Sequence, residues 1–107
     1  MTEEIVGAKW QDNVVALAIE NAEIALSTGQ TETLIVRAVY GGNMPSQRQD
    51  NSNFTFTLGA DGATYAQVAA GTGVVSPVAN GTAYIEVTLT GYNDVPPAYA
   101  EVTVSGM

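Results

Sequence analysis

The residues that could take part in catalysis are carboxylates in predicted loops and the many hydroxyl side chains. Asp50, Asp61 and Asp94 fall in segments where a solvated carboxylate is the ordinary state. A catalytic pair would need two such groups at a defined separation, and nothing in the chain fixes one. Since the chain contains no histidine, its serines and threonines also have no imidazole base to activate them. We therefore expect a protein that is not an enzyme.

Calcium is the cation that the loops could hold, because it takes oxygen ligands from Asp, Asn and carbonyl groups. The segment Tyr92-Asn93-Asp94 could supply some of these ligands. However, the chain has no Asp-x-Asp-x-Asp spacing, and a solvated turn is the simpler interpretation of the segment. We expect neither a bound metal nor a cofactor.

Aromatic side chains are better candidates for binding. Tyr84, Tyr92 and Tyr99 fall on or near the last two predicted strands, with Tyr84 pointing outward. Exposed tyrosines could form a flat platform for glycans or for a partner protein. They could also simply cover the sheet and hydrogen-bond to water.

Residues 1–13, MTEEIVGAKWQDN, form a predicted N-terminal arm that precedes the domain of residues 14–107. Its apolar residues include Ile5, Val6 and Trp10. The arm could be a frayed terminus or an added edge strand that packs Trp10 on the domain. Alternatively, it docks the domain on a larger assembly with Trp10 as an aromatic anchor. The predicted partner-binding residues are Ile5, Val6, Trp10, Tyr84 and Tyr92.

The charge balance argues against two classes of partner. Eleven acidic residues against three basic ones give a net charge of −8. Phosphate contacts with nucleic acid or an anionic membrane therefore have almost nothing to be made from. The N-terminus has no basic start followed by a long apolar run, so it does not resemble a secretory signal. If the chain is complete as given, we expect it to be made in a cytoplasm and not exported by the usual route.

The hydrophobic pattern predicts a β-sandwich of about seven to eight antiparallel strands in one domain. Apolar residues alternate through Ala83, Ile85, Val87 and Leu89, the period expected of a half-buried strand. Residues 41–53 and 91–97 lack such a pattern and are predicted loops. The predicted strands cover residues 14–20, 23–26, 31–40, 54–58, 65–70 and 98–105, with a hairpin over 73–90 that turns at Asn80-Gly81.

The predicted core is made of the inward residues of these strands. In the segment 31–40 the alternation places one set of apolar residues inside, and both phenylalanines of 54–58 should fill the centre. The inward positions outside residues 82–90 are Leu34, Val36, Ala38, Tyr40, Phe54, Phe56, Leu58, Val68, Val102 and Val104.

Several short motifs, in this order, give the chain a family resemblance. They are Leu26-Ser27-Thr28-Gly29-Gln30-Thr31 before Leu34, Gly73-Val74-Val75 before Val78, Asn80-Gly81-Thr82-Ala83 before Ile85, and Val102-Thr103-Val104. With them, residues 14–105 resemble the bacterial Ig-like domains of group 2. The usual tryptophan of the family's third strand is replaced here by Phe54 and Phe56, and the preceding loop is longer.

The resemblance implies a non-catalytic structural or binding protein. Phage particles carry similar domains on virion proteins that assemble in the host cytoplasm, whereas bacterial surface proteins usually carry them in tandem behind a signal peptide. We expect a phage virion accessory protein that decorates a capsid or tail and binds capsid or tail proteins, with the arm as attachment. The alternative is a carbohydrate-binding or adhesive module on a bacterial cell surface, with host-surface glycans or proteins as partners.

Overall fold

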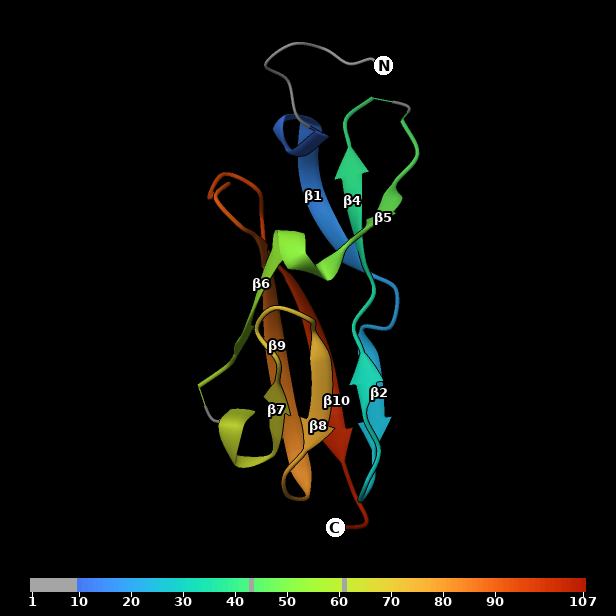
Figure 1. Cartoon of the computed structure of the whole chain (residues 1–107), viewed down its shortest axis with the longest axis vertical. Helices are drawn as coiled ribbons and strands as arrows, with labels where there is room; N and C mark the ends of the chain where they lie inside the picture. The colour runs from blue at the N-terminus through green and yellow to red at the C-terminus, as the bar shows by residue number, and fades with distance from the viewer. Residues whose placement is uncertain (1–9, 43, 61) are drawn as a thin grey trace.

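The computed structural model describes residues 10–42, 44–60 and 62–107 (Figure 1). It confirms an all-β sandwich, but with ten strands in three sheets in place of the expected seven to eight. The helical turns in the described part of the chain are the short 3₁₀ helices η1 (Trp10–Asn13), η2 (Asn51–Asn53) and η3 (Gly62–Thr64). The fold is therefore held by strand pairing and by one core between two layers.

The first layer is a four-stranded sheet in the order β2, β10, β9, β6. Its strands are β2 (Glu23–Leu26), β10 (Ala98–Val104), β9 (Gly81–Leu89) and β6 (Phe54–Leu58). β9 lies at its centre, antiparallel to both β10 and β6, and all four apolar residues of its predicted inner face are buried. β2 pairs with β10 in parallel, so the prediction of a purely antiparallel sandwich is wrong at this edge.

The second layer consists of two three-stranded sheets that share one chain segment, residues 32–40. β3 (Glu32–Thr33) pairs with β8 (Val74–Pro77), which pairs with β7 (Ala66–Val68). β4 (Val36–Tyr40) lies between β1 (Val14–Ile19) and β5 (Gln47–Gln49). With β3 and β4 taken as one strand, the layers follow the immunoglobulin order A-B-E-D and C-F-G, and two strands are additional, β2 beside β10 and β5 beside β4.

The predicted continuous strand 31–40 is interrupted at Leu34 and Ile35, which is a correction. The Ile35 amide donates to Asn21 Oδ1 (2.9 Å), and the Leu34 carbonyl accepts from Asn51 Nδ2 (2.8 Å). The Leu34 amide donates to the Gly73 carbonyl (3.0 Å). These contacts satisfy backbone groups that a regular ladder would otherwise pair. The chain can therefore leave β8 and take up β1 and β5 as neighbours.

The predicted loop 41–53 also needs correction, because it contains β5 and η2. β5 has the sequence Gln-Arg-Gln and pairs with β4 at the edge of its sheet. A polar edge strand shows no hydrophobic alternation, so the pattern in the sequence does not reveal it. Asp50 caps η2 by accepting from the Ser52 amide (2.9 Å).

The core confirms most of the predicted inward positions. Phe54, Phe56 and Leu34 are all buried, as are Val102 and Val104. The exceptions are the half-buried Tyr40, Leu58 and Val68.

Two glycines with positive φ are required by close neighbours. Gly81 has φ of 150°, and a Cβ there would overlap the ring of Tyr65. Gly73 has φ of 71°, and a Cβ there would lie 2.7 Å from the side-chain nitrogen Nδ2 of Asn51. Both positions therefore combine an unusual backbone conformation with lack of space.

We expect Asn51→Ala to lower the free energy of unfolding by about 1–3 kcal/mol. The substitution removes the donor to two carbonyls, those of Leu34 and Thr72, at the break between β3 and β4. Urea denaturation at neutral pH measures the change. Asn53→Ala is the matched control, because its amide makes an exposed bond to the nearby Asp50 carbonyl, and its effect should stay within about 0.5 kcal/mol. Equal effects of the two substitutions would contradict this role of Asn51.

Candidate functional site

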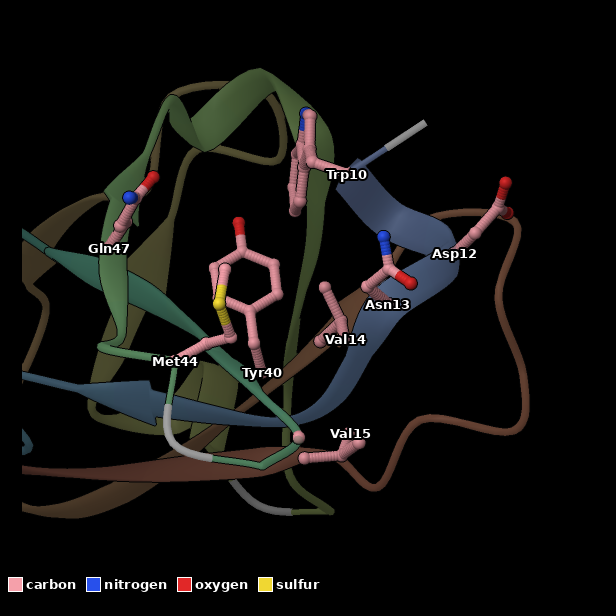
Figure 2. A pocket seen from close by; sticks show the side chains of 9 residues that line it. Trp10, Asp12, Asn13, Val14, Val15, Tyr40, Met44 and Gln47 are labelled. Atoms are coloured by element: carbon pink, nitrogen blue, oxygen red, sulfur yellow. The ribbon is translucent and has the colours of Figure 1, made fainter. Parts of the chain in front are cut away.

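A groove of about 800 Å³ lies at the end of the molecule where the described chain begins (Figure 2). It is formed by η1, the first residues of β1, the end of β4 and the hairpin between β4 and β5. Its lining residues are Trp10, Asp12, Asn13, Val14, Val15, Tyr40, Gly41, Met44 and Gln47. Most of these come from segments that are more than 20 residues apart in the sequence yet adjacent in the β1–β4 pair.

The lining of the groove is largely apolar and partly exposed, with Asp12, Asn13 and Gln47 as its polar members. Figure 2 shows the side chains of Trp10, Tyr40 and Met44 gathered around one space from three different segments. Met44 is 64% exposed and Val15 is 52% exposed, whereas Trp10 and Tyr40 are half-buried against the core. Aromatic residues and Met are enriched where proteins bind one another. The groove therefore suits an apolar side chain of a partner.

A β-bulge explains why Val15 points outward. Val14 pairs with Tyr40 and Ala16 pairs with Val39, so Val15 is the extra residue on β1. A bulge of this kind re-aims one side chain and locally increases the twist of the strand. As a result an apolar residue faces solvent beside Gly41, 3.6 Å from where a Cβ on that glycine would lie.

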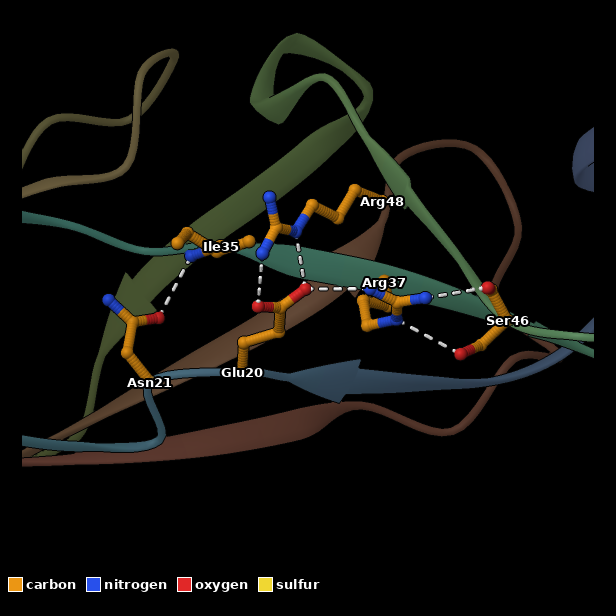
Figure 3. A network of polar contacts seen from close by, with 6 residues as sticks. All are labelled: Glu20, Asn21, Ile35, Arg37, Ser46 and Arg48. Carbon is orange, nitrogen blue, oxygen red and sulfur yellow. Dashed lines mark hydrogen bonds and ion pairs between the residues drawn. The ribbon is translucent and has the colours of Figure 1, made fainter.

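An ionic network holds the hairpin that carries Met44 (Figure 3). Arg37 and Arg48 are cross-strand partners on β4 and β5, and both bind the Glu20 carboxylate, Arg37 at 2.8 Å and Arg48 at 2.5 and 2.7 Å. Arg37 also donates to the side chain and the carbonyl of Ser46, at 3.0 and 2.8 Å. The shared carboxylate offsets the repulsion between two like charges on facing strands. Both strands of the hairpin, β4 and β5, are thereby tied to Glu20.

The same network shifts the acid-base behaviour of Glu20. Hydrogen bonds from Arg48, and then from Arg37, lower the pKa of this carboxyl from 4.5 to about 2. The hydrogen bond with Glu20 in turn raises the pKa of Arg48. Tyr40 is held separately, since its hydroxyl accepts from Gln49 Nε2 at 3.1 Å.

The structure separates the residues predicted to bind a partner. Ile5 and Val6 lie outside the described residues. Trp10 lines the groove, whereas Tyr84 is 53% exposed on the outer face of β9. Tyr92 is half-buried near Asp12, and the pKa of its hydroxyl is raised first by desolvation and then by that carboxylate. Whether any of these residues binds a partner stays a prediction.

The predicted tyrosine platform is therefore smaller than expected. Tyr84 and Tyr99 share the outer face of the β9–β10 pair, whereas Tyr92 belongs to the loop that follows β9 and packs partly on the core. Sequence reasoning also missed two groove residues, Val15 and Met44. An apolar Met44 within the polar stretch Gly-Gly-Asn-Met-Pro-Ser was the signal that could have found the second one.

Among residues 10–42, 44–60 and 62–107, no group of three or more His, Cys, Asp and Glu residues is placed to hold a metal ion. No helix in the same part of the chain has the length and apolar character needed to cross a membrane.

Comparison with known proteins adds no relative: no family model matches the chain, and neither does any curated protein. The likeness to bacterial Ig-like domains of group 2 therefore rests on the short motifs in the sequence. The strand order supports the broader immunoglobulin-type architecture.

We expect Glu20→Gln to destabilise the protein at neutral pH and to have no effect near pH 2. Because the folded-state pKa of about 2 lies below the ordinary 4.5, the ionised carboxylate stabilises the fold above about pH 4.5. That stabilisation is lost as the pH falls from 4.5 toward 2. Urea denaturation of both proteins across this range measures the difference. Glu23→Gln on β2 is the control for loss of one negative charge, and an equal pH-dependent difference there would contradict the role of the network.

Proposed function

We propose that this protein is a non-catalytic Ig-like binding module that attaches to a larger assembly through its groove. The single observation that carries the proposal is the apolar surface at one end of the molecule, where Val15 and Met44 are exposed beside the half-buried Trp10. Single exposed apolar residues are common on protein surfaces, but a group of them around a concave site indicates an interaction. The remaining sandwich serves as a scaffold that presents its other surfaces.

The assembly that we propose is a phage virion, with the protein as an accessory on the capsid or tail. This setting comes from the resemblance to group 2 bacterial Ig-like domains, which occur on virion proteins. The position of the groove supports it, because the groove lies where the predicted arm of residues 1–13 meets the sandwich. An anchor at that end would leave the long faces of both sheets free.

The test compares two methionine substitutions on particles from the strain that encodes the chain. Met44→Glu places a charge in the groove, whereas Met107→Glu makes the same change at the other end of the molecule (Figure 1). Both methionines are exposed, by 64% and 48%, so neither change should alter stability by more than about 0.5 kcal/mol. We expect the protein to band with virions in a density gradient. Met44→Glu should reduce its amount roughly tenfold, the loss expected when a buried anchor is replaced by a charge.

Two results would count against the proposal. Virions that lack the protein would rule out the accessory role itself. Normal amounts of the Met44→Glu protein in the particle band would keep that role but rule out the groove as the attachment site. The fluorescence of Trp10, the sole tryptophan, provides a direct readout, because occupation of the groove should shift its emission.

A second candidate function is a carbohydrate-binding or adhesive module of a bacterial surface protein. The observation that favours it is the exposure of Tyr84 and Tyr99, by 53% and 59%, on one sheet face. Tyrosine rings can stack on the apolar face of a sugar. Binding on a glycan array that is lost in Tyr84→Ala and kept in Met44→Glu would support this function over virion attachment.

A further inference from the structure

A second surface, distinct from the groove, lies on the outer face of the four-stranded sheet. Its centre consists of four residues: Tyr84 and Glu86 on β9, and Tyr99 and Glu101 on β10. Tyr84 is directly opposite Glu101, and Glu86 is directly opposite Tyr99. Tyrosines and glutamates therefore alternate in both directions across the two strands. We name these four residues the tyrosine–glutamate face.

Hydrogen bonds fix the orientation of both tyrosines. The Tyr84 hydroxyl donates to Glu101 Oε2 at 3.1 Å, and the Tyr99 hydroxyl donates to Glu86 Oε2 at 3.2 Å. Each phenol thereby uses its only proton within the sheet. What remains available to a partner is acceptor capacity on the carboxylates and the faces of two exposed rings. Both features attract cations.

The charged side chains on the strands around the face are all carboxylates. Glu23 on β2 is paired in register with Glu101, which adds a third carboxylate next to the four residues. The sequences of β2, β6, β9 and β10 contain no lysine or arginine. Arg37 and Arg48 lie in the other layer and are bound to Glu20. The carboxylates of the face therefore have no cationic partner within their own sheet.

We propose that the tyrosine–glutamate face binds a cationic segment of a partner protein, in which arginine or lysine side chains alternate with small residues. An arginine guanidinium can donate two hydrogen bonds to a carboxylate and lie over an aromatic ring at the same time. Along each strand, a ring and a carboxylate stand two residues apart, roughly 7 Å. An extended partner has the same repeat, so alternate side chains of its chain can meet the face in register.

The raised pKa values of both tyrosines are consistent with a negatively charged surface. The hydrogen bond with Glu101 raises the pKa of Tyr84, and the charge of Glu86 raises the pKa of Tyr99. Both shifts reflect a negative potential at the phenols. A glycan would gain nothing from that potential, whereas a cationic segment would, and this difference favours the protein partner.

The experiment titrates the isotope-labelled full chain with an arginine–serine repeat peptide and follows backbone amide shifts by NMR. We expect the shifts to gather on β9 and β10 around Tyr84, Glu86, Tyr99 and Glu101. The affinity should fall as salt rises from about 0.01 to about 0.15 M. Glu86→Gln combined with Glu101→Gln keeps a hydrogen-bond acceptor for each tyrosine, and it should weaken binding roughly tenfold.

Matched variants separate a specific site from general attraction to an acidic protein. Glu32→Gln combined with Asp94→Asn removes the same charge from β3 and from the loop after β9, both outside the four-stranded sheet, and should leave the affinity within about twofold. Equal weakening by both pairs, or amide shifts spread over all acidic segments, would overturn the proposal. Glycan binding that requires Tyr84 and Tyr99, with no peptide binding, would overturn it as well. None of these readouts uses virions, so they are independent of attachment through the groove.

Discussion

The structure depends on how the backbone amides and carbonyls are hydrogen-bonded where β3 becomes β4. At Leu34 and Ile35 the chain leaves one sheet for another, and polar backbone groups there would be costly if left unpaired. Two asparagine amides, from Asn21 and Asn51, take the place of neighbouring strands at 2.9 and 2.8 Å. Because Asn51 also reaches the Thr72 carbonyl, and Gly73 leaves room for it, three distant segments meet at this one point. The second layer can therefore change its strand partners and still cover the core continuously.

This change of partners produces the groove. Once the chain has left β8 at the end of β3, β4 pairs with β1 on one side and β5 on the other, and the hairpin between β4 and β5 carries Met44 to the end of the molecule. The Glu20 network then holds that hairpin through two arginines and Ser46. Such a network makes little use of hydrophobic burial, so it can be built at an edge that faces solvent. The apolar side chains of Val15 and Met44 thereby remain exposed.

The two surfaces that we propose for binding differ in chemistry and position. The groove is lined largely by apolar residues and is formed where strands end, whereas the tyrosine–glutamate face is acidic and lies across the middle of a sheet. A module anchored at its end would keep that face accessible. The net charge of −8 disfavours contact between copies of the chain and favours a cationic partner. On these two proposals, the sandwich would hold the attachment surface apart from the recognition surface.

The hydrophobic pattern of the chain was enough to predict the class of fold and the inner face of its long strands. Alternation through Ala83, Ile85, Val87 and Leu89 can be satisfied only by a strand with one buried side, and Asn80-Gly81 marked where that strand begins. The break at Leu34 and Ile35 could not be predicted from the sequence, because Leu34, Val36 and Ala38 keep the same hydrophobic period across it. β5 could not be predicted either, because a polar edge strand has no hydrophobic period.

The sequence pointed to Trp10, Tyr84 and Tyr99 as separate residues, but their neighbours in the groove and in the tyrosine–glutamate face come from the tertiary structure. Both require knowing which strands pair and in which register, and a shift of one residue would turn Tyr84 away from Glu101. Local sequence fixes which way a side chain points relative to its own strand. Its neighbours across the sheet are set by the packing of the whole core, which is a property of residues far apart in the chain.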